Sequence, residues 1–197
     1  MMTLYQLGEY NNKTDLSEQS KVIRDYVISH NDYESLNKLI NSFDFLEEES
    51  IIILKRAILA GYWTSYYGFN WTPEQEIDFW ELVFSKNQKS GVAILTLAES
   101  YRGHKVKTLK EVIDLYFKAI EINSEHYYSL MPEDLELLRT DSELKYRFIK
   151  IELDNYEKIW NRADFEEEYP YLIERCKEDF KMIDYVKKRI DNILKDK

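Results

Sequence analysis

The chain has 197 residues, of which 44% are hydrophobic and 32% charged, which is enough apolar material for a core without disulfides. With 5 glycines and 3 prolines the chain has few turn-forming residues to separate many short strands, so the composition favours long helices. The formal net charge of −10 repels phosphate backbones and anionic lipids, which disfavours direct binding to nucleic acid or to a membrane.

The chain also lacks the marks of export. Cys176 is the single cysteine, so no intramolecular disulfide can form. Residues 1–12 have neither the basic start nor the apolar run of a signal peptide, and no segment approaches the roughly 18 apolar residues of a membrane-spanning helix. We therefore expect a cytoplasmic protein.

The first predicted helix covers residues 17–30, where apolar residues recur at helical spacing and Ser17 or Thr14 serves as the N-cap. A break at 30–32 separates it from a second apolar stripe, formed by Leu36, Leu39, Ile40 and Phe43. The short break predicts that the two helices fold back on each other as a hairpin.

A third helix is predicted to begin near the acidic residues 47–49 and to run to about Tyr67, since acids suit the positive end of a helix. The four apolar residues 51–54 are also compatible with a buried strand. The small residues that continue at helical spacing to Gly61 favour the helix.

The clearest helix start follows, with Thr72 as N-cap, Pro73 at the first position and Gln75 completing a capping box. This helix is expected to turn Ile77, Trp80 and Phe84 inward. Further helices are predicted after Ser90 and after Thr108. Hairpins then begin near Ser17, Ser50 and Ser90, in or near the roughly 33–47-residue spacing of helical-hairpin repeats.

The helical pattern lapses over residues 124–131, and Pro132 opens a short helix. We accordingly divide the chain into a hairpin region, 1–131, and C-terminal helices, 132–197, packed on it as one continuous domain. Asp141 is expected to cap a long helix reaching Trp160, and a final helix to run from about Pro170 to Leu194. The near-heptad spacing of the final helix also allows self-association as a coiled coil.

Residues 92–123 contain a recognisable order of small, apolar and aromatic residues, formed by Ala93, Leu97, Tyr101, Tyr116, Lys118 and Ala119. This order resembles a tetratricopeptide repeat of the Sel-one-like subclass. Ala98 replaces the glycine of that pattern, and Gly103 comes one position early. The resemblance covers about a sixth of the chain and implies a scaffold that binds partners. Together with the helix pattern it predicts an all-α, α-solenoid-like stack of antiparallel helical hairpins, capped by two long C-terminal helices.

The common catalytic motifs are absent from the sequence. The sequence contains no HExxH, no glycine-rich phosphate loop and no Gly-x-Ser-x-Gly, and its three histidines are widely separated. Cys176 lies on an apolar stripe, which is typical of a structural thiol. We predict no catalytic, cofactor-binding or metal residues; an enzyme built on Glu125, His126 and Tyr127 is the alternative.

An aromatic run between the third and fourth helices is the best candidate for function, since Tyr and Trp dominate interface hot spots. An aromatic-rich core there is the alternative interpretation. With two tyrosines from the repeat-like segment, the candidate partner-binding residues are Tyr62, Trp63, Tyr66, Tyr67, Trp71, Tyr101 and Tyr116.

The sequence thus predicts a non-enzymatic protein-binding module. A concrete form is an acidic inhibitor of the immunity or antitoxin type that masks a basic partner protein. The alternative is an adaptor or regulatory scaffold that binds a peptide or small ligand in a hairpin groove, with Tyr101 and Tyr116 in its wall.

Overall fold

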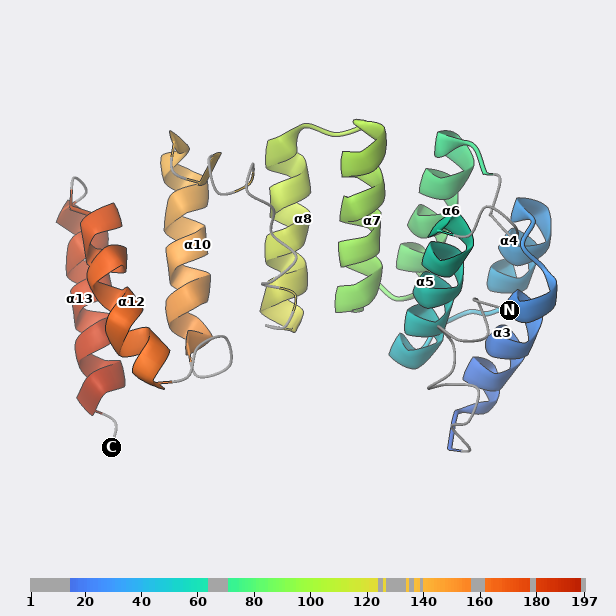
Figure 1. Ribbon diagram of the computed structural model, residues 1–197, viewed down its shortest axis with the longest axis horizontal. Coiled ribbons are helices and arrows are strands. Elements are labelled where there is room, and N and C mark those ends of the chain that lie inside the picture. Colours follow the sequence, from blue (N-terminus) through green and yellow to red (C-terminus); the bar gives the residue numbers. More distant parts are fainter. Residues whose placement is uncertain are drawn as a thin grey trace. The chain divides into compact units, whose positions relative to one another are not determined.

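The computed structural model describes residues 15–63, 71–123, 126, 134, 137–138, 140–156, 162–177 and 180–195. These residues form helices and loops, with no strand among them, which confirms the all-α class (Figure 1). The chain divides into two compact units, Met1–Thr108 and Leu109–Lys197, each of which is described by itself. The predicted boundary at 131/132 lies outside the described residues.

The N-terminal unit contains α3 (Glu18–Ser29), α4 (Tyr33–Asn41), α5 (Glu48–Trp63), α6 (Pro73–Lys86) and α7 (Gly91–His104). Helix α5 packs on both α3 and α7, while α4 packs on α6, and α6 packs on α7. Alternate helices of the chain are therefore neighbours, in the two rows α3, α5, α7 and α4, α6 (Figure 1). The packing of α6 on α7 connects the two rows.

Local capping fixes where these helices begin. The side chain of Ser17 accepts a hydrogen bond from Ser20 N at 3.1 Å, and that of Ser90 accepts from Ala93 N at 2.9 Å. At α6 both halves of the predicted capping box form: Thr72 Oγ1 accepts from the backbone N–H of Gln75, and Gln75 Oε1 accepts from that of Thr72. The predicted starts at Ser17, Thr72 and Ser90 are confirmed.

Helix α5 is apolar on several sides, which explains why residues 51–54 were ambiguous in sequence. Ile51, Ile53 and Leu54 are all fully buried. A helix covered on one side by α3 and on another by α7 needs apolar residues on both faces. The alternative of a buried strand over 51–54 is therefore wrong.

The end of α7 differs from the family pattern. Lys105, not a glycine, adopts the left-handed conformation that closes the helix, with φ 55° and ψ 35°. Val106 N donates to Tyr101 O at 3.0 Å and Lys105 N donates to Arg102 O at 3.2 Å, the two bonds of a Schellman motif. Gly103 lies two residues earlier, inside the helix.

The C-terminal unit contains α8 (Leu109–Ile122), α10 (Ser142–Asp154), α12 (Arg162–Arg175) and α13 (Phe180–Lys195). Asp141 caps α10 as predicted, accepting hydrogen bonds from Glu143 N and Leu144 N, both at 3.0 Å. Helix α10 ends at Asp154, short of the predicted end at Trp160.

The prediction of one final helix from about Pro170 is wrong, because this part of the chain forms two helices. Pro170 lies inside α12, and α13 begins at Phe180. Helices α12 and α13 pack on each other, so Leu172 and Cys176 share a core cluster with Val186. Two helices that fold back bury more of this apolar surface within the unit than one continuous helix would.

The apolar face of α13 is used inside the C-terminal unit. Val186, Ile190 and Ile193 are buried, and α13 packs on both α10 and α12. The buried face of α13, which includes Ile190 of the predicted stripe, therefore already has neighbours in the same chain. Within the described helices, none is long and apolar enough to cross a membrane.

Candidate functional site

The predicted partner-binding aromatics fall into different environments. Trp71 is partly buried: its indole Nε1 donates to Asn31 O at 3.1 Å, and its ring packs edge-on against Phe79 and Tyr33. For Tyr62 and Trp63 the structure describes the backbone in α5 but not the side chains, and residues 66–67 lie outside the described residues.

The two tyrosines from the repeat-like segment are buried. Tyr116 is 1% exposed and Tyr101 8% exposed. The Tyr101 hydroxyl donates to Glu81 Oε1, and the pKa of this tyrosine is raised by burial and then by the adjacent carboxylate. A partner would reach these rings only by displacing their neighbours, so the prediction that they form a binding surface gains no support from their placement.

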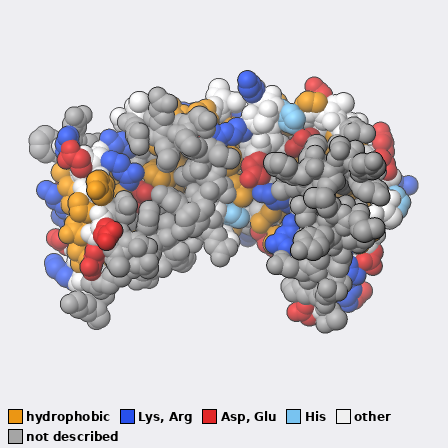
Figure 2. All heavy atoms as spheres, in the orientation of Figure 1, with side chains coloured by type: hydrophobic (Ala, Val, Ile, Leu, Met, Phe, Trp, Pro, Cys, Tyr) orange, Lys and Arg blue, Asp and Glu red, His pale blue; other side chains and the backbone are white. Residues whose placement is uncertain are grey.

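A pocket of about 370 Å³ lies between α5, α6 and α7 in the N-terminal unit. Its apolar part comes from Ile58 of α5 and Trp80 of α6, and its polar part from Glu76 of α6 and a stripe along α7. That stripe consists of Thr96, Glu99, Ser100, Gly103 and His104. Figure 2 shows acidic and basic side chains close together on the surface of the described residues.

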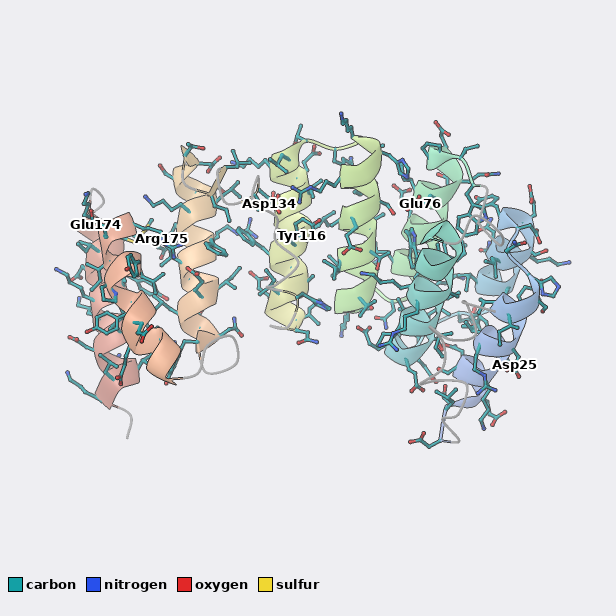
Figure 3. The ribbon with its side chains drawn as sticks, in the orientation of Figure 1. Asp25, Glu76, Tyr116, Asp134, Glu174 and Arg175 are labelled. Atoms are coloured by element: carbon teal, nitrogen blue, oxygen red, sulfur yellow. The ribbon has the colours of Figure 1, made fainter. Side chains whose placement is uncertain are left out.

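Glu76 connects the two helices that frame the pocket. It reaches from α6 toward α7, where its Oε1 accepts a hydrogen bond from Ser100 Oγ at 2.9 Å and its Oε2 lies 2.8 Å from His104 Nε2 (Figure 3). A carboxylate has only acceptors, so the imidazole nitrogen is the donor in this contact. The Glu76 side chain is 17% exposed, which leaves it accessible from the pocket.

The serine, glutamate and histidine do not form a hydrolytic triad. In such a triad the imidazole takes the proton of the nucleophilic hydroxyl and the carboxylate orients the imidazole. Here the Ser100 hydroxyl donates to Glu76 itself, and His104 bonds to the other oxygen of the same carboxylate. The carboxylate separates the two groups that would have to exchange a proton.

The second carboxylate of the pocket, Glu99, has a cationic neighbour. Its Oε2 lies 2.8 Å from Nζ of Lys55 on α5, and the lysine side chain is 18% exposed. One turn further along α5 is Ile58 in the apolar part of the pocket. Among the described residues that line the pocket are therefore two carboxylates, one of them paired with the Lys55 ammonium, and an imidazole that is charged only when protonated.

A metal site is not present among the described residues, and the alternative enzyme site lies mostly outside them. Nowhere in these ranges do three or more His, Cys, Asp or Glu side chains gather as metal ligands would. Of the alternative enzyme site, His126 is described and its backbone N–H donates to Asn123 O at 3.1 Å, while residues 125 and 127 lie outside the described residues.

Sequence reasoning missed this pocket, although one local signal was present. The polar stripe of α7 follows the spacing i, i+3, i+4, i+7, i+8 in a helix whose other residues are mostly apolar and buried. Such a stripe indicates a face turned toward solvent or a cavity. That Glu76, Trp80 and Ile58 lie opposite this face depends on helix packing, which no local pattern reveals.

Compared with known proteins, the chain matches no protein-family model, no curated protein and no solved structure. The resemblance to a tetratricopeptide repeat therefore stays a prediction.

Proposed function

We propose that this chain is a non-enzymatic protein-binding module that covers a basic surface of a partner protein. The observation that carries the proposal is the pocket between α5, α6 and α7, where two carboxylates lie beside the apolar surfaces of Ile58 and Trp80. Pockets with an apolar floor and a few placed charges are typical of sites that hold a protruding group of a ligand.

The charge of the chain supports the same partner. Acidic residues outnumber basic ones in both 1–108 and 109–197. Such a field attracts a basic protein over a distance of about 10 Å at moderate ionic strength and speeds its association. An acidic inhibitor of the immunity type, which masks the basic active surface of another protein, is the most concrete form of this function.

The two rows of alternate helices in the N-terminal unit also fit this role. Helices α3, α5 and α7 lie in one row, as the first helices of stacked hairpins do. In repeat scaffolds these rows provide extended surfaces for a partner.

The test is capture of a partner by the tagged full-length chain from lysate of its native source, at low and at high salt, followed by titration with the purified partner. We expect one basic protein whose Kd weakens by about tenfold or more between 50 and 500 mM salt. A partner of acidic or neutral charge, or a Kd that does not change with salt, would contradict the masking function.

The second candidate is an adaptor that reads a short peptide or small ligand in the same pocket. The volume of about 370 Å³ lies within the usual range of small-ligand pockets, and this observation favours the second candidate. It predicts binding to short segments without inhibition of any enzyme. Titration with short peptides distinguishes it from the inhibitor.

A further inference from the structure

We propose that the pocket is a receptor for one arginine side chain of the partner, and that Lys55 competes with that arginine for Glu99. The inference rests on the proposed protein-binding function, because it names the group of the partner that the pocket recognises. It follows from how the hydrogen-bonding groups around the pocket are already used.

The polar atoms that line the pocket offer acceptors rather than donors. The Thr96 hydroxyl donates a hydrogen bond to Val92 O at 2.8 Å, and the Ser100 hydroxyl donates one to Glu76 Oε1 at 2.9 Å. Both hydroxyl oxygens keep lone pairs for a ligand. With the carboxylates of Glu76 and Glu99, the lining presents four groups able to accept hydrogen bonds.

Two donors described at the pocket are already occupied. His104 Nε2 donates to Glu76 and the Lys55 ammonium lies on Glu99. An acceptor-rich lining calls for a ligand that brings several donors and a positive charge. A guanidinium brings five N–H donors in one plane, keeps its charge in proteins and is weakly hydrated.

The hydrogen-bonding groups of the lining, rather than its apolar floor, distinguish arginine from lysine. Trp80 and Ile58 form the floor and are each 1% exposed, so the ligand meets mainly the carboxylates and hydroxyls above them. A lysine ammonium is more strongly hydrated and has three donors, so it would leave more of the acceptors without a ligand contact.

The ion pair between Lys55 and Glu99 should compete with binding of the partner's arginine. If Glu99 helps to bind the partner's arginine, its ion pair with Lys55 must weaken for the ligand to enter. Replacing Lys55 by methionine removes the competing charge while keeping an apolar stem. The variant should therefore bind arginine more tightly, even if it folds less stably.

The experiment uses the full-length chain and three capped tripeptides, acetyl-Gly-X-Gly-amide, in which X is arginine, citrulline or lysine. Citrulline has the shape of arginine without the charge. Binding is followed by NMR through the amide signal of Gly103 and the indole signal of Trp80, both at the pocket. We expect a millimolar Kd for the arginine peptide, and binding about tenfold weaker for the other two.

Variants assign the effect to the pocket. Glu76→Gln should weaken binding of the arginine peptide by about tenfold. Glu18→Gln is the same change of charge at a side chain that is 88% exposed, and it should leave the affinity for this peptide unchanged. Lys55→Met should tighten it by about threefold. Gly103→Leu should abolish binding, because a side chain at this helical position enters open space beside the pocket.

Two results would overturn the inference: equal signal changes with arginine and citrulline, or unchanged affinity in Lys55→Met. Circular dichroism of each variant reports whether it folds, and Glu76→Gln keeps the test decisive if Gly103→Leu does not. If a basic partner binds in a salt-sensitive way but the arginine peptide does not bind, the proposed function holds and the arginine site is contradicted. If the arginine peptide binds but no basic protein partner is found, the arginine site holds and the proposed function is contradicted.

Discussion

Two buried serines allow the packing of α3 on α5 to be tested by a double-mutant cycle. Ser20 and Ser50 are 0% exposed, and their hydroxyl oxygens lie 2.9 Å apart. Replacing one by alanine removes the hydrogen bond and leaves the other hydroxyl buried with that bond lost. The expected loss in the free energy of unfolding is about 1.5 kcal/mol for Ser20→Ala or Ser50→Ala alone.

Replacing both serines removes the lost bond and the stranded hydroxyl together. Because two apolar groups of similar shape then face each other, the double variant should lose only about 0.5 kcal/mol. The two single losses would sum to about 3 kcal/mol, so the coupling energy should be about 2.5 kcal/mol in magnitude. Ser85→Ala, at an exposed serine of α6, should change the stability by less than about 0.5 kcal/mol.

Urea unfolding followed by tryptophan fluorescence is the suitable assay, since Trp63, Trp71 and Trp80 all belong to the N-terminal unit. A coupling energy near zero would mean that the two hydroxyls do not meet. It would refute the contact between α3 and α5 on which the row of alternate helices depends.

Three further predictions concern the α6 and α7 region. Lys105→Gly should stabilise the chain by about 1 kcal/mol, because Lys105 occupies a left-handed position. Gly103→Ala should stabilise it by about 0.5 kcal/mol, because an added Cβ meets nothing within 4 Å. Thermal melting checks both variants, and a drop in Tm for either would contradict the geometry. Thr72→Ala should lower the stability by about 1 kcal/mol through loss of the cap, whereas Thr72→Ser should be close to neutral in the same melts. Burial and Glu81 raise the pKa of Tyr101, so the stability it provides is complete below about pH 10, where the unfolded tyrosine is protonated, and is lost as pH rises toward the folded value. Tyr101→Phe should accordingly lose stability less steeply above about pH 10 in urea titrations, and an unchanged slope would show that its hydroxyl titrates normally in the folded chain.

The helix starts were the part of the fold most readable from sequence, because each depends on atoms a few residues apart. A serine, threonine or aspartate side chain accepts from a backbone N–H two or three positions later, as Ser17, Thr72, Ser90 and Asp141 do. The helix ends were less readable. The left-handed residue that closes α7 is Lys105, although Gly103 is nearby, since the bonds of the last turn decided the position.

The final helices show where the local pattern was misleading. Apolar residues at helical spacing continue on both sides of Pro170 and through Cys176, so the sequence alone did not reveal that the chain folds back after α12. Leu172 and Cys176 of α12 share a core cluster with Val186 of α13, and burial in this cluster favours two helices over one. This cluster joins residues about ten or more positions apart and is visible only in the folded unit.

By itself the sequence determined the all-α class, the capped helix starts and the acidic charge, because these follow from composition and from contacts within one turn. The tertiary structure decided that Tyr101 lies buried against Glu81, and that Glu76 of α6 faces the polar stripe of α7 above Trp80 and Ile58. A pocket formed by three helices depends on how their side chains interlock, and that interlocking is a property of the packed unit rather than of any single segment.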